Sequence, residues 1–251
     1  MELIDTHCHL YFDPLATDVP GVLGRARAEG VVQVVVPAYD LSSWEAMPTL
    51  VGPGVAVAYG LHPWKANQPL ELDLLEQQIR STGAVAVGEI GLDFAIPDAD
   101  RRRQIDAFTE QLDLARRLDL PVILHCRRAF DAMEALLRER GPVRGVLHAF
   151  SRGPELARRL VEGLDLHLAF GGGVTRPAAR RSRESVATVP ARRLLLETDA
   201  PSIGLEGVPP ERTEPRHVAR VAAVVAELRG ERPEQVAEQT TENARQLFRL
   251  S

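Results

Sequence analysis

Short runs of apolar and β-branched residues recur along the whole chain, and longer, more polar stretches separate them. Strands that are buried on both faces of a parallel sheet read as continuous apolar runs rather than as an apolar–polar alternation. The runs therefore predict eight parallel strands, at residues 3–10, 31–38, 55–62, 84–92, 121–126, 145–150, 165–171 and 193–199.

The stretches between these runs carry helical spacing. The clearest example follows Asp100, where an apolar stripe recurs at i, i+3, i+7 and i+10 through Ile105, Phe108, Leu112 and Ala115. Proline near the start of several other stretches suits the first turn of a helix. Further helices are predicted at about residues 131–140, 154–162, 178–189, 215–229 and 233–250.

This alternation of strand and helix is typical of an α/β protein with a (β/α)8 TIM-barrel fold, which usually needs about 250 residues. The chain has 251 residues, and no linker or low-complexity segment divides it. We therefore predict one barrel domain over residues 1–251. An open doubly wound sheet is the alternative, but the first predicted strand lacks the glycine-rich phosphate-binding turn of that fold.

Composition narrows the function classes. The formal net charge is −5, which argues mildly against a binder of long duplex DNA but leaves local phosphate recognition open. Cys8 and Cys126 are the only cysteines, so neither a disulfide framework nor a cysteine-based zinc site is plausible. No apolar run approaches a membrane span, and no basic segment precedes the first strand. We expect a cytoplasmic protein without a membrane partner, and we favour a monomer.

Polar residues gather where the predicted strands end. Active sites of (β/α)8 barrels lie at the carboxyl ends of the strands. Five of the seven histidines stand at such ends, where chance would scatter them through loops and surface helices. The polar residues at these ends are His7, His9, His62, Glu89, His125, His148 and Asp199.

Imidazoles and carboxylates together suit divalent metals, and one ion commonly takes about four protein ligands. Four histidines with Glu89 and Asp199 are too many for one catalytic ion and suit two. A carboxylate bridge reduces the repulsion between paired cations, and Glu89 is a candidate for that bridge. The alternative is a purely structural cluster. The sequence leaves zinc, manganese and magnesium open as the native metal.

The ordered set of motifs resembles the TatD family of metal-dependent hydrolases over nearly the whole chain. The matching segments are "DTHCH", "GLHP", "VGEIGLD", "LPVILHCR", "HAFS", "LLLETDAP", "RTEPRHV" and "NARQLF". The resemblance implies a (β/α)8 fold, a two-cation centre and hydrolysis of ester bonds, with nuclease activity on DNA in several members. It implies two ligand sets that share Glu89: His7, His9, Glu89 and Asp199 for one cation, and Glu89, His125 and His148 for the other.

The rim of the site departs from the common family pattern, whereas the implied metal ligands are retained. The differences fall at Ala149, Arg128 and Ser202, in "HAFSRG", "CRRAF" and "ETDAPS". The bridging carbamylated lysine of phosphotriesterase-like sites is not available here, because Lys65 is the only lysine and follows the third strand.

We expect a phosphodiesterase that acts on nucleic-acid ends, of the 3′–5′ exonuclease type of deoxyribonuclease. Asp199 is expected to orient the attacking water and accept its proton. His62 would donate a hydrogen bond to the substrate, and Arg127 and Arg152 would bind its phosphates. Asp5 and Glu197 are expected to hydrogen-bond the ligands from behind. The alternatives are a metal-dependent deacylase or amidohydrolase, and a non-catalytic scaffold.

Overall fold

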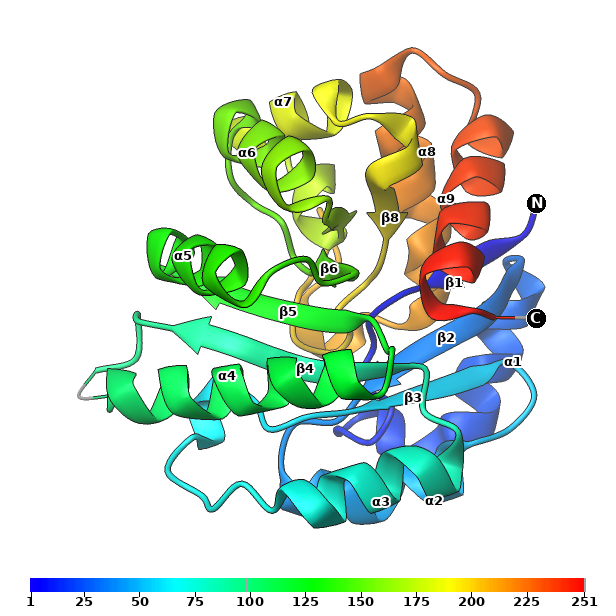
Figure 1. The fold of residues 1–251 in the computed structure, drawn as a ribbon. Coiled ribbons are helices and arrows are strands. Elements are labelled where there is room, and N and C mark those ends of the chain that lie inside the picture. Colours follow the sequence, from blue (N-terminus) through cyan, green and yellow to red (C-terminus); the bar gives the residue numbers. More distant parts are fainter. Residues whose placement is uncertain (98, 251) are drawn as a thin grey trace.

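The strands form a single parallel sheet that curls into a barrel (Figure 1). The computed structural model describes residues 1–97 and 99–250. The strand order follows the chain from β1 to β8. The strands are β1 (Leu3–Asp5), β2 (Val31–Pro37), β3 (Val55–Tyr59), β4 (Ala86–Asp93), β5 (Val122–Arg127), β6 (Gly145–Leu147), β7 (His167–Phe170) and β8 (Leu194–Leu196).

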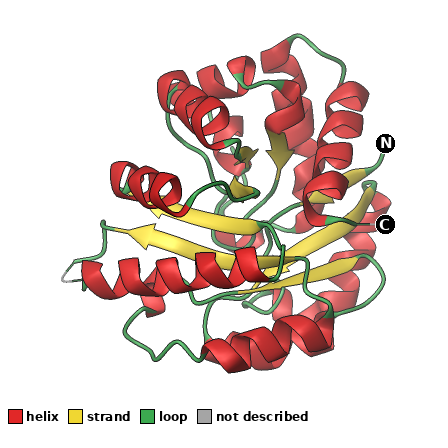
Figure 2. Ribbon diagram, viewed as in Figure 1, coloured by secondary structure: helices red, strands yellow, loops and turns green. Residues whose placement is uncertain are grey.

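Helices cover the outside of the strands, as Figure 2 shows. One α-helix follows each strand along the chain, and a further helix, α9, ends the described part. The α-helices are α1 (Val19–Ala28), α2 (Leu41–Leu50), α3 (Leu72–Thr82), α4 (Arg101–Arg117), α5 (Phe130–Arg140), α6 (Pro154–Leu164), α7 (Arg180–Thr188), α8 (Val218–Arg229) and α9 (Pro233–Phe248). The predicted (β/α)8 barrel is therefore confirmed.

Hydrogen bonds beyond the ladder close the seam between β8 and β1. The amide of Thr6 donates to the carbonyl of Leu196 at 3.1 Å. The amide of Thr198 donates to Asp5 Oδ1 at 2.9 Å. An isolated parallel bridge then joins Cys8 to Ala200. These contacts hold the two ends of the sheet together at the level where the functional side chains begin.

One end of the barrel interior is filled with apolar side chains. Each strand contributes one buried residue to this layer, and the C-terminal helix α9 packs beneath it. The layer consists of Ile4, Val35, Ala58, Ala86, Ile123, Val146, Ala169 and Leu195, with Ala244, Leu247 and Phe248 of α9. A packed interior of this kind is a core and not a pore, so chemistry is confined to the opposite, carboxyl end.

Several strands end earlier than their apolar runs suggest. The run at 3–10 yields only β1, and the run at 145–150 yields only β6, which ends directly before His148. Ala149 and Asp199 then adopt positive φ angles of 47° and 52°, which do not continue a strand. The backbone therefore leaves the ladder where the polar side chains turn into the barrel mouth.

Cys8 and Cys126 are free, and neither belongs to the polar cluster at the mouth. Cys8 is fully buried in the core between strands and helices, and Cys126 packs against the same core. None of the helices in the described ranges, 1–97 and 99–250, combines the length and the apolar character that a membrane crossing requires.

Phe248 tests whether α9 seals the barrel interior. Phe248 is 2% exposed, so Phe248→Ala should lower the free energy of unfolding by roughly 3–5 kcal/mol through lost burial and a residual cavity. Leu74→Ala on α3 is the matched control, because Leu74 is 41% exposed. Urea denaturation measures both variants, and equal losses would contradict the seal.

Candidate metal centre

The six predicted metal ligands meet at the mouth of the barrel. They come from the segment after β1, from β4 and β5, and from the residues that follow β6 and β8. Five of the six are buried, and His125 is partly exposed, with 16% of its side chain accessible. The members of this cluster are His7, His9, Glu89, His125, His148 and Asp199.

Glu89 lies between two groups of imidazoles and directs one carboxylate oxygen to each. Its Oε1 lies 3.0 Å from His125 Nδ1 and 2.9 Å from His148 Nε2. Its Oε2 lies 3.2 Å from His7 Nε2 and 3.8 Å from His9 Nε2. A carboxylate in this position has one oxygen available to each of two neighbouring cations.

The spacing of the nitrogens fits shared coordination. His7 Nε2 lies 3.2 Å from His9 Nε2, and His125 Nδ1 lies 3.3 Å from His148 Nε2. Two tetrahedral ligands at ordinary zinc–nitrogen distances stand about 3.3 Å apart. Asp199 Oδ1 completes the first group, 3.4 Å from His9 Nε2. The donor set of imidazole and carboxylate therefore suits a divalent metal.

The tautomer of His9 is fixed by its surroundings. The Tyr11 hydroxyl donates to the carbonyl of Pro37 at 3.0 Å, so its oxygen accepts from His9 Nδ1, also at 3.0 Å. The proton of the neutral ring therefore resides on Nδ1. His9 Nε2 keeps a free lone pair toward His7 and Asp199, which is the form that a metal ligand requires.

Asp93 fixes the tautomer of His125 in the same way. The sequence analysis did not predict a role for Asp93. Asp93 Oδ2 accepts from His125 Nε2 at 3.2 Å and from Trp64 Nε1 at 2.7 Å. In the neutral ring the proton is thus held on Nε2, which leaves Nδ1, beside Glu89, as the nitrogen that can bind a metal. Asp93 orients a predicted ligand from behind.

Strand parity is the signal that could have identified Asp93. The register of β4 shifts between Val87 and Ile90, and both residues pack outward together with Leu92. Glu89 and Asp93 are four positions apart, so both side chains point to the inner face. An acidic residue two or four positions from a predicted bridging carboxylate in the same strand is therefore a candidate hydrogen-bond partner for the histidines that bind the metal.

His62 also reaches the cluster, 3.2 Å from Glu89 Oε1 through Nε2. His62, Glu89 and His125 together are close enough to form a third candidate ligand group. However, His62 Nδ1 accepts the backbone amide of Trp64 at 3.1 Å, which puts the ring proton on Nε2. The neutral ring therefore presents an N–H donor to the site, whereas His9 and His125 present lone pairs.

Glu197 and Asp5 support the ligand backbone. Glu197 Oε1 accepts the amide of Ala149 at 2.6 Å and lies 3.9 Å from His148 Nδ1. Asp5 accepts the amide of His7 at 3.3 Å and the hydroxyl of Thr198 at 2.6 Å. These two carboxyl groups hold the segments after β6, β1 and β8 in place.

The electrostatics favour the ligand forms of several side chains. Burial lowers the pKa of His7 and of His62 to about 4, so both rings are neutral at physiological pH. Burial would raise the pKa of Glu89, but the surrounding histidines, led by His148, outweigh it and hold the pKa well below its usual value. Burial likewise opposes the lowered pKa of Asp199, which His9 and His7 produce. Both carboxylates are therefore ionised.

The two predicted substrate-binding arginines lie at the rim and are exposed. Arg127 lines a cavity of about 290 Å³, and so do His125, His148 and Asp199. Arg152 lines a neighbouring groove. Their roles in substrate binding stay predictions.

A comparison of nearly the whole chain with known protein families shows to which family it belongs. The family model described as "TatD related DNase" matches residues 4–249, which includes every segment that carries the cluster. The chain belongs to the TatD family. It is a metal-dependent hydrolase, as its TatD relatives are named.

Two curated TatD-family relatives match the chain from end to end. YjjV of Escherichia coli K12 is 39% identical over 254 residues, with 98% of each chain covered. YabD of Bacillus subtilis 168 is 35% identical over 255 residues, with 99% of this chain and 100% of that protein covered. Both are named uncharacterized metal-dependent hydrolases. The crystal structure of YjjV superimposes with a TM-score of 0.91 and 36% identity, over 99% and 98% of the two chains.

Asp93→Ala tests the orienting role of that carboxylate. Loss of an outer hydrogen-bond partner typically weakens metal binding about 10–100-fold, and we expect zinc affinity to fall by that factor with the fold intact. Asp73→Ala on the exposed face of α3 is the matched control. Zinc titration calorimetry measures both, and unchanged affinity in Asp93→Ala would remove Asp93 from this role.

Zinc affinity should rise with pH because binding displaces a proton from His148. Burial lowers the pKa of His148, but Glu89, Glu197 and Asp199 outweigh it and raise the pKa to about 10 in the metal-free protein. Protons and zinc compete for this ring. As the pH rises from about 6 to about 8 the zinc affinity should therefore increase, by up to about tenfold per pH unit. Calorimetry in buffers of different ionisation enthalpy counts the released proton. Wild type should release more protons than His148→Gln, and equal release would contradict this.

Proposed function

We propose that the protein is a two-cation phosphodiesterase that acts on nucleic-acid ends, as a deoxyribonuclease of the 3′–5′ exonuclease type. The observation that carries the proposal is the position of Glu89, with one oxygen toward His7 and the other toward His125 and His148. Paired cations suit ester hydrolysis at phosphorus because they can stabilise both the attacking and the leaving oxygen. The description of the matching family as DNase-related supports DNA as the substrate.

The proposed ligand sets follow the two groups around Glu89. The first set is His7, His9, Glu89 and Asp199, and the second is Glu89, His125 and His148. When bound, divalent cations there would acidify a water and neutralise charge on the phosphoryl oxygens; zinc, manganese and magnesium are the candidates. All of the proposed ligands come from one chain, which supports a monomer as the active unit.

Asp199 is the proposed general base. It lines the cavity at the mouth, and its lowered pKa keeps the carboxylate ionised and able to accept a proton. His62 presents its Nε2–H to the same site and would donate a hydrogen bond to a substrate oxygen. Arg127 lines the cavity beside Asp199, and its guanidinium suits a phosphate oxygen pair. Arg152, farther out along the rim, would bind a neighbouring phosphate.

A substrate panel with a metal control tests the function. The protein should shorten 3′-overhang DNA when magnesium, manganese or zinc is supplied, and a chelator should abolish the reaction. Asp199→Asn should lower kcat by roughly 10²–10⁴-fold, because a carboxamide cannot accept the proton. Gel analysis of labelled DNA measures both effects.

The control variant is Asp119→Asn, which changes an exposed carboxylate beside Arg144 and Arg249. It should cleave DNA as the wild type does. Retained cleavage by Asp199→Asn would remove Asp199 as the base. Turnover of carboxylic esters or amides without any cleavage of DNA would overturn the proposal in favour of a deacylase or amidohydrolase.

A further inference from the structure

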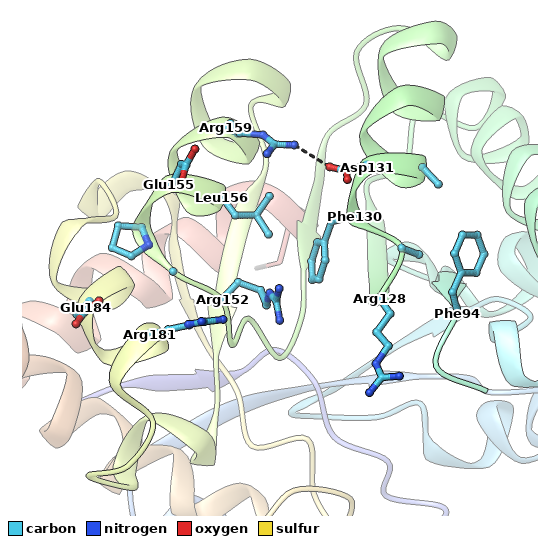
Figure 3. Close-up of a pocket in the computed structure, with 14 residues that line it drawn as sticks. Phe94, Arg128, Phe130, Asp131, Arg152, Glu155, Leu156, Arg159, Arg181 and Glu184 are labelled. Atoms are coloured by element: carbon cyan, nitrogen blue, oxygen red, sulfur yellow. Dashed lines mark hydrogen bonds and ion pairs between the residues drawn. The ribbon is translucent and has the colours of Figure 1, made fainter. Parts of the chain in front are cut away.

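A second, larger groove adjoins the cavity at the mouth. Its volume is about 750 Å³, and it lies over the carboxyl ends of β4 and β5 and the starts of α5, α6 and α7 (Figure 3). None of the proposed metal ligands lines it. The side chains on which the inference rests are Phe94, Arg128, Phe130, Arg152 and Arg181.

The groove borders the cavity that holds the predicted base. Three pairs of consecutive residues are divided between the two spaces, at 127–128, 151–152 and 181–182. In each pair one residue lines the cavity and its neighbour lines the groove. Consecutive Cα atoms are about 3.8 Å apart, so the two spaces share a common wall. The two spaces therefore lie side by side at the rim, within reach of one chain-like substrate.

Three arginines in the groove are available to a ligand. Arg128, Arg152 and Arg181 are exposed, and no carboxylate in residues 1–97 or 99–250 lies within salt-bridge distance of them. A fourth arginine, Arg159, is already paired with Asp131 at 3.1 Å. Guanidinium groups that lack a protein partner suit the phosphates of a polyanion.

Two aromatic rings stand among these arginines. Phe94 and Phe130 are half-buried in the groove wall, and the Arg152 guanidinium lies over the Phe130 ring, 5.4 Å from its centroid. Positive charge beside aromatic faces is the combination with which proteins bind unpaired nucleotides, because the charge holds the backbone and the rings stack on bases.

The acidic residues restrict where such a chain can lie. Glu155 and Glu184 also line the groove, and Figure 3 shows them on the side away from Phe94 and Arg128. Their charge repels a phosphate backbone from that side. The favourable path therefore runs past Phe94, Arg128, Phe130 and Arg152, and Arg181 reaches its edge from the side of Glu184, with its guanidinium toward Arg152 (Figure 3).

We propose that this groove binds the unpaired nucleotides adjoining the scissile phosphodiester, with phosphates on Arg128, Arg152 and Arg181 and bases on Phe94 and Phe130. This inference rests on the proposed phosphodiesterase function. It adds to that site a region that binds the part of a long substrate outside the metal cavity. It predicts that long substrates depend on the groove, whereas a substrate confined to the metal cavity does not.

The double variant Arg128→Glu, Arg181→Glu tests the charge, because both arginines line the groove and neither lines the metal cavity. With manganese supplied, it should raise KM for a single-stranded oligonucleotide of about ten nucleotides by about tenfold or more. Turnover of bis-p-nitrophenyl phosphate, which is too short to reach the groove, should not change. Arg220→Glu on the exposed face of α8 is the charge-matched control and should affect neither substrate.

Phe130→Leu tests the stacking. Leucine keeps an apolar side chain at the wall but removes the aromatic face, so KM for the oligonucleotide should rise about five- to tenfold. KM for an abasic chain of the same length should stay constant. Equal effects on both chains, or equal effects of the charge variant on the long and the minimal substrate, would overturn the groove as a nucleotide-binding region.

Binding separates this inference from the proposed function. If the wild type cleaves no phosphodiester, the proposed function is contradicted. Fluorescence anisotropy with the labelled oligonucleotide and the full chain then still tests whether the groove binds nucleotides. Binding by the wild type that Arg128→Glu, Arg181→Glu weakens at least tenfold would support the groove. Absence of binding, or equal binding by the two proteins, would refute it.

Discussion

The organising constraint of this molecule is the burial of one ionised carboxylate, that of Glu89. A buried charge is costly unless polar partners surround it. Here the partners are imidazoles from four other strand ends, those of β1, β3, β5 and β6, and they keep the Glu89 pKa low despite burial. Each oxygen of Glu89 contacts a different group of histidines. The contacts that stabilise its buried charge therefore also join the two halves of the candidate metal centre.

The outer partners decide what each imidazole can do. In their neutral forms, His9 carries its proton on Nδ1 beside Tyr11 and His125 carries its proton on Nε2 beside Asp93, so the inward nitrogen of each ring is left to bind a cation. The backbone amide of Trp64 has the opposite effect on His62, which turns an N–H inward. Residues outside the cluster thus decide the role of each histidine. They make His9 and His125 candidate ligands and make His62 a hydrogen-bond donor.

The fold and the members of the cluster were largely readable from the sequence. Continuous apolar runs of strand length, each followed by a helical stripe, leave few architectures, and histidines at strand ends are rare by chance. The sequence analysis missed Asp93, although its even spacing from Glu89 indicated the same face of the strand, because its role depends on contacts with His125 and Trp64 that lie far away along the chain. The donor role of His62 rests on a turn that brings the Trp64 amide to its ring. The division of the rim arginines between cavity and groove depends on loop paths that no periodicity encodes.

Anomalous diffraction from crystals grown with manganese or zinc tests the central idea most directly. We predict two peaks on opposite sides of the Glu89 carboxylate, one beside His7, His9 and Asp199 and the other beside His125 and His148. A single peak, or peaks only outside this cluster, would contradict a two-cation centre bridged by Glu89.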